Sequence, residues 1–391
     1  MFLTAQNFTK GNIRSRKGTQ GKNADFGPFS VDTMPGLADA SGMNFTARSK
    51  LKTTLKTPAD LASAGLISTA DVTALQDVAA KYAIAIPRAL QGLMDEPGVA
   101  RQFVPTVAEL QTAAAELSDP IGDHSHAPVK GVVHRYPDRV LLMPTLACAV
   151  YCRFCFRRET VGDKGLSAAE LDAALNYIKS DTRIWEVILT GGDPLILSAR
   201  RLREIIRALN EIEHVKVLRI HTRVPVAAPE TIDAELVNVL KQCAKTLYVG
   251  VHCNHPAELT DTVKRALANL ADAGIPLLAQ TVLLKGVNDN AETLEALFRA
   301  LVEARVRPYY LHQLDLAPGT SHFRVPLERG RALIQGLRGG LSGIALPTYI
   351  LDIPGGAGKV PATNSFISPE GDGSYLVRDN AGEIHTYRPC D

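Results

Sequence analysis

Three cysteines lie close together in the chain: Cys148, Cys152 and Cys155, in a C-x3-C-x2-C spacing. Three thiolates on one short loop can hold three irons of a cubane cluster and leave the fourth iron without a protein ligand. Because iron–sulfur clusters otherwise take four cysteines, the open iron suggests that a substrate or cofactor binds there. A tetrahedral zinc site would need a fourth ligand, and none follows at short spacing, since His134 and Cys253 are remote in sequence. Zinc or inert cysteines stay as alternatives.

A lysine stands in a glycine-rich stretch, Pro354–Pro361 (PGGAGKVP). A phosphate-binding loop would need a glycine where Ile353 stands and a serine or threonine where Val360 stands, so that interpretation fails. Glycines beside Lys359 permit the close approach of a flat cofactor, and a lysine with a lowered pKa can form a Schiff base with a carbonyl compound. The alternative is an ordinary lysine on a surface turn.

After Arg139, short apolar runs rich in β-branched residues alternate with amphipathic stretches of helical period. The runs predict strands over Val140–Thr145, Glu186–Thr190, Val215–Thr222, Thr246–Cys253, Leu277–Leu284 and Pro308–Gln313. The amphipathic stretches predict helices near 167–179, 198–211, 230–244, 258–273, 291–304 and 327–337. Six βα units in succession imply an α/β fold with a parallel sheet, either an open doubly wound sheet or a full or partial barrel.

Polar side chains gather where these predicted strands end. They are Cys148, Cys152 and Cys155 after the first strand, Gly191, Gly192 and Asp193 after the second, Arg219, His221 and Arg223 on the third, His252, Asn254 and His255 on the fourth, Gln280 on the fifth, and His312, Gln313 and Asp315 on the sixth. Because parallel α/β folds place their active sites at the carboxyl ends of strands, one catalytic mouth should collect these groups.

The flanking segments differ in character from this central region. Helix-start signals at Pro58 and Ser68 predict a helical region over 57–138, of which 116–138 is loop-like. The central barrel-like region is expected over 139–345. A C-terminal segment, 346–391, is expected to carry the glycine-rich lysine, a further strand at Thr348–Asp352, and a hairpin formed by Tyr375–Arg378 and Ile384–Arg388.

Composition bounds the class of protein. The 391 residues are 46% hydrophobic, which is enough for a large core. The net charge is only +2, so the sequence lacks the large positive charge expected of a protein that coats nucleic acid. No apolar stretch approaches the roughly 20 residues of a membrane span. Six cysteines, three of them clustered, indicate metal chemistry in a reducing compartment, the cytoplasm, rather than a disulfide scaffold.

The charge is unevenly distributed along the chain. Residues 1–24 hold five basic residues and no acid, which leaves −3 for residues 25–391. The segment lacks the apolar core of a secretory signal. We expect 1–56 to form a basic, disordered tail, or part of it to precede a true start at Met43.

The cysteine motif resembles the signature of radical S-adenosylmethionine (SAM) enzymes, and Cys148–Arg158 (CAVYCRFCFRR) resembles the lysine 2,3-aminomutase family within them. The likeness runs from about Pro105 to Gly382. It includes His134–Leu141 (HRYPDRVL), Thr190–Leu195 (TGGDPL), His252–Pro256 (HCNHP), Val282–Asp289 (VLLKGVND), Tyr309–Asp315 (YYLHQLD) and Asp352–Pro361 (DIPGGAGKVP). The resemblance implies a partial (βα)6 radical-SAM barrel with a helical N-terminal extension and a small C-terminal extension.

The resemblance also implies roles for individual residues. Cys148, Cys152 and Cys155 would hold a [4Fe-4S] cluster, and the turn Gly191, Gly192 and Asp193 would lie against SAM. Lys359 would carry pyridoxal 5′-phosphate (PLP), with Arg135, Arg139 and Gln280 near that cofactor. Arg157 would bind the substrate carboxylate, and Asp315 with Asp352 would bind the ε-ammonium of lysine. An enzyme for glutamate would be expected to lack this acid pair.

The implied reaction converts L-lysine to β-lysine by a 1,2-shift of the amino group, with flavodoxin or ferredoxin as the electron donor. The shorter branch that supplies β-lysine for elongation factor P, and an arginine 2,3-aminomutase, are the nearest alternatives; a non-catalytic iron–sulfur or zinc protein is a more distant one. Relatives can carry an intersubunit zinc site with one cysteine just after GVND and others at the C-terminus. Here Asn290 and a lone Cys390 occupy those places, so the zinc and the associated homo-oligomer are in doubt.

Overall fold

The computed structural model describes residues 54–162, 165–371, 373–380 and 382–389. The chain divides into two units, Met1–Phe45 and Thr46–Asp391, and all the described residues belong to the second. The basic tail expected over 1–56 lies outside the described residues, apart from its last three positions.

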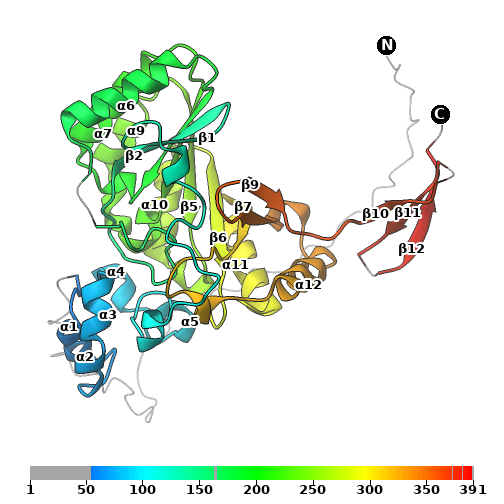
Figure 1. The fold of residues 1–391 in the computed structure, drawn as a ribbon, viewed down its shortest axis with the longest axis horizontal. Helices are drawn as coiled ribbons and strands as arrows, with labels where there is room; N and C mark the ends of the chain where they lie inside the picture. Colours follow the sequence, from blue (N-terminus) through cyan, green and yellow to red (C-terminus); the bar gives the residue numbers. More distant parts are fainter. Residues whose placement is uncertain (1–53, 163–164, 372, 381, 390–391) are drawn as a thin grey trace, which may run out of the picture. The chain divides into compact units, whose positions relative to one another are not determined.

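A nine-stranded sheet forms the centre of this unit, with its strands in sequence order from β1 to β9 (Figure 1). Strands β2 to β8 run parallel, whereas β1 pairs antiparallel with β2 at one edge and β9 pairs antiparallel with β8 at the other. The strands are β1 (Val132–Tyr136), β2 (Arg139–Thr145), β3 (Glu186–Gly191), β4 (Val217–Thr222), β5 (Thr246–His252), β6 (Leu277–Leu283), β7 (Val306–Gln313), β8 (Thr348–Ile353) and β9 (Gly358–Pro361).

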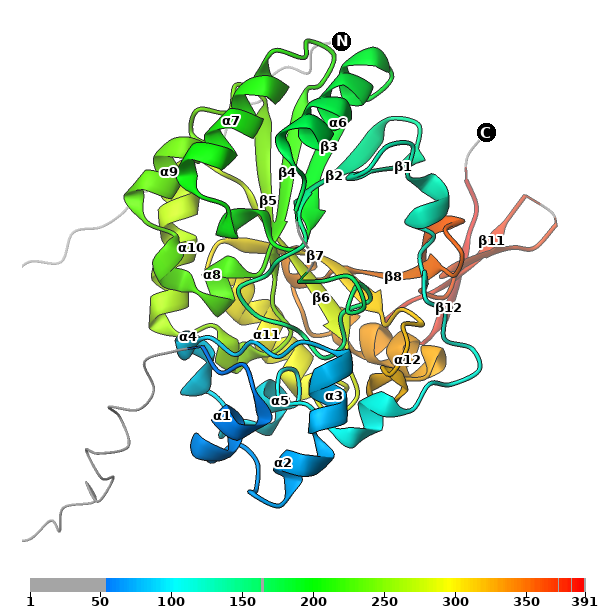
Figure 2. The ribbon, with the colours of Figure 1, turned by 60° about the vertical axis from the view of Figure 1, so that its left-hand side comes forward.

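Long helices connect the parallel strands and cover the outer face of the sheet (Figure 2). They are α6 (Ala168–Ser180), α7 (Ala199–Asn210), α9 (Ala234–Leu240), α10 (Asp261–Asp272), α11 (Ala291–Glu303) and α12 (Leu327–Arg338), with the short α8 (Val224–Ala227) after β4. Side-chain oxygens of Ser167, Ser198, Asp233, Thr260 and Asn290 cap the N-termini of five of them. The apolar stripe of α7 is buried against the strands, which is why periodicity alone could locate this helix.

An N-terminal helical region precedes the sheet and packs near the cysteine loop. Its helices are α1 (Pro58–Ser63), α2 (Asp71–Ala74), α3 (Gln76–Lys81), α4 (Arg88–Gln91) and α5 (Pro97–Ala100). They build a second apolar core that also takes in Val150 and Ala227, with Cys152 against it. The backbone N–H groups of Tyr151 and Arg153 donate to the carbonyls of Ala85 and Gln102, so this region is hydrogen-bonded directly to the cysteine loop.

Short elements complete the described chain. The 3-10 helices are η1 (Val107–Leu110), η2 (His124–His126), η3 (Pro194–Ile196), η4 (Pro229–Thr231), η5 (Pro256–Glu258), η6 (Ser321–Phe323) and η7 (Gly343–Ala345). A separate antiparallel sheet contains β10 (Ile367–Pro369), β11 (Tyr375–Arg378) and β12 (Ile384–Tyr387). Within the described residues, no helix combines the length and apolar character needed to cross a membrane.

The predicted α/β architecture with successive βα units is confirmed, and two local predictions need correction. The stretch 116–138, predicted to be loop-like, contains β1, which adds an antiparallel edge to the sheet. The helix predicted near 230–244 is shorter, because the 3-10 turn η4 precedes α9. The glycine-rich segment forms a β-hairpin, in which Gly355 and Gly356 adopt positive φ and Gly358 begins β9.

Candidate active site

The cysteine loop follows β2, the first parallel strand, and is closed by backbone hydrogen bonds. The N–H of Gly162 donates to the carbonyl of Leu146 at 2.7 Å, which joins the two ends of the loop, and the N–H of Cys155 donates to the carbonyl of Cys152. Burial raises the pKa of the Cys155 thiol to about 11 and raises that of Cys148 well above its usual value. These sulfurs therefore favour the thiol form unless a cation binds them.

The spacing of the three sulfurs argues against a single zinc ion. Among the described residues, the three Sγ atoms do not all lie within 4.8 Å of one another. Tetrahedral zinc with sulfur ligands at about 2.3 Å would bring those atoms to roughly 3.8 Å apart. A polynuclear cluster, in which each sulfur binds a different iron, needs a wider separation. As placed, the three thiols do not form a mononuclear site, and three thiols on one loop are a donor set that fits an iron–sulfur cluster.

The turn after β3 packs directly on the cysteine loop. Gly191 has a φ of +101°, and a Cβ on Gly192 would lie 2.1 Å from the carbonyl oxygen of Ala147, so neither position accepts an ordinary side chain. The N–H groups of Gly192 and Asp193 donate to the carbonyls of Thr145 and Ala147, each at 2.8 Å. The turn predicted to lie against SAM is thereby held beside Cys148.

The Asp193 carboxylate is used within the protein. It accepts hydrogen bonds from the Thr222 hydroxyl at 2.7 Å and from the backbone N–H groups of Leu195, Arg223 and Val224. Burial is the main cause that raises the pKa of this carboxyl, and the four donors oppose it. Asp193 therefore joins the ends of β3 and β4, and its direct contact with SAM stays a prediction.

Two arginines of the cysteine loop share one buried carboxylate from the N-terminal region. Glu109 is fully buried and accepts from Arg153, whose Nη2 lies 2.6 Å from Oε2, and from Nη2 of Arg158. Arg158 also stacks over Tyr82, with its Cζ 3.5 Å from the ring centroid. Because a buried carboxylate with two cationic partners is costly to break, this contact fixes the loop to the helical region.

A third arginine contacts a cysteine itself. Nη1 of Arg223, at the end of β4, donates to Sγ of Cys152 at 2.8 Å. Burial raises the pKa of the Cys152 thiol, and the charge and hydrogen bond of Arg223 oppose that shift.

Lys359 lies on the hairpin at the far edge of the sheet. In the β8–β9 pairing Asp352 stands directly opposite Lys359, so both side chains emerge on one face. Nζ of Lys359 forms an ion pair with the Asp352 carboxylate, whose side chain is 3% exposed. Burial of the amine lowers the pKa of Lys359 to about 8, and Asp315 acts against that shift. A neutral amine is therefore accessible to Lys359 at ordinary pH.

Arg135 and Arg139, predicted near the PLP phosphate, have different surroundings. Arg135 forms an ion pair with Asp352 at 3.1 Å and donates to the carbonyl of Ile121. Arg139 is partly exposed, pairs with Asp138, and stacks on the Tyr136 ring at 3.8 Å. The Tyr136 hydroxyl in turn accepts a hydrogen bond from the backbone N–H of Lys359. Both arginines thus reach the Lys359 hairpin, Arg135 through Asp352 and Arg139 through Tyr136.

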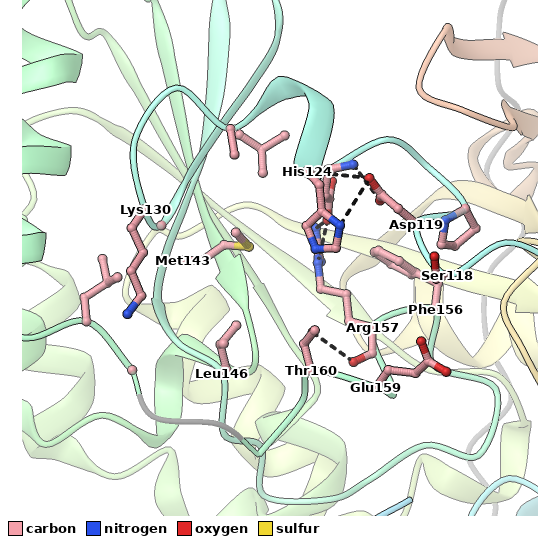
Figure 3. Close-up of a pocket in the computed structure, with 17 residues that line it drawn as sticks. Ser118, Asp119, His124, Lys130, Met143, Leu146, Phe156, Arg157, Glu159 and Thr160 are labelled. Atoms are coloured by element: carbon pink, nitrogen blue, oxygen red, sulfur yellow. Dashed lines mark hydrogen bonds and ion pairs between the residues drawn. The ribbon is translucent and has the colours of Figure 1, made fainter. Parts of the chain in front are cut away.

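Arg157 extends from the cysteine loop toward residues 118–124 (Figure 3). Its Nη2 lies 2.6 Å from the Asp123 carboxylate, and both side chains are mostly buried. This pair borders a cavity of about 280 Å³ between residues 118–133 and 143–166, whose walls include Met143, Phe156 and Thr160. Among the predicted site residues, this cavity is lined by Arg157 and by neither the three cysteines nor Lys359.

The remaining predicted residues gather around Lys359 and the strand ends. Burial raises the pKa of Asp315 to about 6, and the charges of Lys359, Arg157 and Arg135 partly offset this. Burial lowers the pKa of His312 to about 3, so this imidazole is neutral at ordinary pH. Gln280 bonds the ring of His221 through its Nε2 at 3.0 Å. The structure therefore brings together Arg135, Arg157, Asp315, Asp352 and Lys359.

Several contacts of this site could not be assigned from the sequence. Asp123 lies in a stretch of loop residues, and nothing in its spacing marks it as the partner of Arg157. Tyr136 belongs to the HRYPDRVL motif but carried no assigned role. Glu109 ends a T-x-x-E capping box that begins at Thr106, which marks a helix start and not a partner for the cysteine loop.

Comparison with known proteins identifies the family. A model described as the radical SAM superfamily matches residues 142–299, and one described as lysine-2,3-aminomutase matches residues 334–391. An L-lysine 2,3-aminomutase of Acetoanaerobium sticklandii is 45% identical over 295 residues, which cover 75% of this chain and 71% of that protein. The chain belongs to the lysine 2,3-aminomutase family of radical SAM enzymes.

Other relatives of this aminomutase family differ in their named substrate. An L-lysine 2,3-aminomutase of Clostridium subterminale is 44% identical over 74% of this chain and 70% of its own length. A glutamate 2,3-aminomutase of Clostridioides difficile is 38% identical over 72% of this chain and 67% of its own length. Among solved structures, a radical SAM methyltransferase from Sphaerobacter thermophilus aligns with a TM-score of 0.42 and 21% identity over 56% of this chain and 68% of its own length.

Membership in the aminomutase family establishes the class of chemistry. The protein is an isomerase, and the radical SAM family implies a [4Fe-4S] cluster and SAM, which agrees with the three partly buried thiols on one loop. Asn290, at the place of the cysteine that some relatives use for zinc, caps α11 by accepting from the N–H of Thr293 at 2.8 Å. Cys390 lies outside the described residues.

Proposed function

We propose that the protein is a lysine 2,3-aminomutase that converts L-lysine to β-lysine (3,6-diaminohexanoate), with PLP carried on Lys359. The family alone does not decide the substrate, because relatives of similar identity are named for lysine and for glutamate. The decision rests on the charges around Lys359.

The observation that carries the proposal is the pair of acids, Asp315 and Asp352, beside Lys359. Asp352 lies on β8 and Asp315 lies in the segment after β7. The Asp352 carboxylate forms an ion pair with Lys359, and the charge of Asp315 acts on Lys359 against the lowering of its pKa by burial. Two carboxylates attract a side-chain ammonium and repel a side-chain carboxylate, so they favour lysine over glutamate. Arg157, whose charge also acts on Lys359 and Asp315, supplies a cation for the α-carboxylate.

The residues around Lys359 also fit PLP. A lysine whose pKa is about 8 has a substantial neutral fraction near pH 7.5, as attack on an aldehyde requires. The buried Nε2 atoms of His252 and His312 have no hydrogen-bond partner in the described chain, so both nitrogens can take a polar atom of a bound group as partner. PLP and the cluster with SAM supply the electron-accepting ring and the one-electron chemistry when they are bound.

The protein's own residues have three tasks in this proposal. Arg157 and the acid pair fix the two ends of the substrate, which orients the carbons that exchange the amino group. The imidazole of His312 is neutral and adds no positive charge beside the ammonium. The buried walls of the mouth exclude water that would quench reactive species.

The central test is anaerobic incubation of the reconstituted enzyme with dithionite and SAM, offering lysine, arginine or glutamate separately. We expect β-lysine by mass spectrometry from lysine alone. Product from arginine, or from glutamate, with lysine inert, would overturn the substrate assignment and leave the family assignment standing.

A variant pair tests the acid residues directly. Asp352→Asn should reduce kcat/KM for lysine on the order of 10- to 100-fold, since one desolvated charge–charge contact is removed. Asp272→Asn removes a carboxylate from an exposed pair with Arg305 and should have no effect. Equal activity of the two variants would contradict a role of Asp352 in lysine binding.

We further propose a cytoplasmic enzyme that takes electrons from flavodoxin or ferredoxin. The three clustered thiols need a reducing compartment, and the cluster needs a one-electron donor. Replacing dithionite with reduced flavodoxin or ferredoxin should sustain β-lysine formation. Failure of both proteins to do so would exclude this choice of donor.

A further inference from the structure

Arg223 is the feature that the family assignment leaves unexplained. Its guanidinium is 6% exposed, and each terminal nitrogen has a partner: Nη1 donates to Sγ of Cys152 at 2.8 Å, and Nη2 donates to Gln102 at 2.7 Å and to Glu258 at 2.6 Å. Among the described residues, Sγ of Cys148 and Sγ of Cys155 receive no hydrogen bond from a charged side chain, and the donor to Cys155 is the neutral backbone N–H of Arg157. The three cluster thiols are therefore electrostatically unequal.

The position of Arg223 is fixed on several sides. Its Cζ lies 4.5 Å from the centroid of Phe103 and 5.7 Å from that of Phe154. Its backbone N–H donates to Asp193 at 2.6 Å. The backbone hydrogen bond and the two ring contacts together hold the guanidinium beside Cys152.

The counter-charge of Arg223 is held just as firmly. Glu258 is fully buried, and its second oxygen accepts from the backbone N–H groups of Asn254 and His255 and from Gln102. The Arg223 cation therefore lies between the Cys152 sulfur and the Glu258 carboxylate, with one terminal nitrogen bonded to each. Such a fixed dipole, shielded from water, acts at full strength on a charge that changes at the sulfur.

We propose that Arg223 sets the reduction potential of the cluster by donating a hydrogen bond to Sγ of Cys152. Hydrogen bonds to the sulfurs and nearby charges are the means by which a protein tunes an iron–sulfur potential. One electron from an external reductant converts [4Fe-4S]²⁺ to [4Fe-4S]⁺, with no bond made or broken. The added negative charge is stabilised by the guanidinium, so Arg223 raises the potential, and Glu258 moderates this effect.

The first experiment is an anaerobic redox titration of the reconstituted full chain, followed by visible absorbance and by the electron paramagnetic resonance signal of the reduced cluster. In Arg223→Gln we expect the ratio of reduced to oxidised cluster at a fixed potential to fall about tenfold, which for one electron equals about 59 mV. Arg223→Lys keeps the charge and should shift less. An Arg223→Gln protein with about four irons per chain and an unchanged potential would refute the proposal.

A second variant separates tuning from mere destabilisation. Glu258→Gln removes the anion and keeps the cation, so the potential should move upward, opposite to Arg223→Gln. A structural defect would instead lower the iron content of both variants without shifts of opposite sign. If Arg223→Gln cannot hold a cluster, the direction of the Glu258→Gln and Arg223→Lys shifts decides, and a downward or absent Glu258→Gln shift refutes the proposal.

The matched control is Arg219→Gln, on β4 four residues before Arg223. Arg219 is similarly buried and pairs with Glu186 at 3.0 Å, but it contacts no cysteine. Its removal should leave the potential unchanged, and a shift equal to that of Arg223→Gln would refute a specific role of the Cys152 contact. These measurements need no amino-acid substrate, so their outcome is independent of the proposed lysine specificity.

Discussion

Around the cysteine loop the charged side chains are buried and paired across distant parts of the chain, while around Lys359 they stand at the edge of the sheet. Glu109 is fully buried between two arginines, and Glu258 is fully buried against one, Arg223. Lys359 and Arg139 are 31% and 34% exposed in their side chains. The first arrangement suits a group that stays bound, and the second suits molecules that must enter and leave.

The two regions also depend on different parts of the sequence. The cysteine loop is fixed by contacts from the N-terminal helices and the end of β4, whereas Lys359 is fixed by its own hairpin, by Asp352 and by Tyr136 of β1. Substitutions in one region should therefore leave the other intact. The following predictions test that independence, from the largest expected effect to the smallest.

Lys359→Ala should abolish the reaction without disturbing the cluster. We expect turnover to fall on the order of 10⁴-fold or more, as when other activated nucleophiles are removed. Iron analysis should still give about four irons per chain. Lys264→Ala, an exposed lysine on α10, is the control and should behave as wild type. Loss of iron in Lys359→Ala would show that the two regions are not independent.

Glu109→Gln should cause the largest loss of stability. Two buried arginines of the cysteine loop would lose their common counter-charge, at a cost of about 3–5 kcal/mol in the free energy of unfolding. Denaturant titration measures this cost. Glu295→Gln, in an exposed pair with Arg299, should cost less than about 0.5 kcal/mol. Similar values for both variants would contradict the buried anchoring described here.

Gly192→Ala should disturb the cysteine loop more mildly. The new Cβ would meet backbone atoms of Leu146 and Ala147, which must move, at about 1–3 kcal/mol. Because those backbone atoms belong to the cysteine loop, the iron content per chain should also fall. Gly336→Ala, inside α12 with no atom within 4 Å of the new Cβ, should be neutral or stabilise by about 0.5–1 kcal/mol. A normal iron content in Gly192→Ala would show that the turn can yield.

Lysine affinity should weaken at low pH. Asp315, with a pKa of about 6, is ionised above that pH and neutral below it, while the lysine ammonium stays protonated throughout. Since only about a quarter of such a carboxyl is ionised at pH 5.5, KM for lysine should rise about fourfold between pH 8 and pH 5.5. In Asp315→Asn this dependence should disappear, and a persistent dependence would point to another group.

The parts of this architecture that follow from local rules could be predicted from the sequence. Buried strands and capped helices are marked by period and by residues such as Ser167 and Thr260, and parallel strands then bring their ends together. The pairing of Arg135 with Asp352, or of Arg153 with Glu109, joins residues far apart in sequence and depends on tertiary packing. The spacing of residues in the sequence therefore does not predict these contacts.

The hairpin shows a further limit of local reasoning. The glycines beside Lys359 were predicted to permit the close approach of a flat cofactor, and two of them, Gly355 and Gly356, also shape a turn between paired strands. A run of glycines is compatible with a loop or a hairpin, and only the pairing of β9 with β8 distinguishes the two.

The length of the turn in the β8–β9 hairpin determines whether Lys359 and Asp352 lie on the same face of the strand pair. Successive side chains on a strand point to opposite faces, so one residue added to or removed from Pro354–Ala357 would turn Lys359 away from Asp352. The amine would then lose its neighbour and its surroundings although no reactive atom had changed. The count of residues between acid and lysine is as much a part of this site as the two side chains themselves.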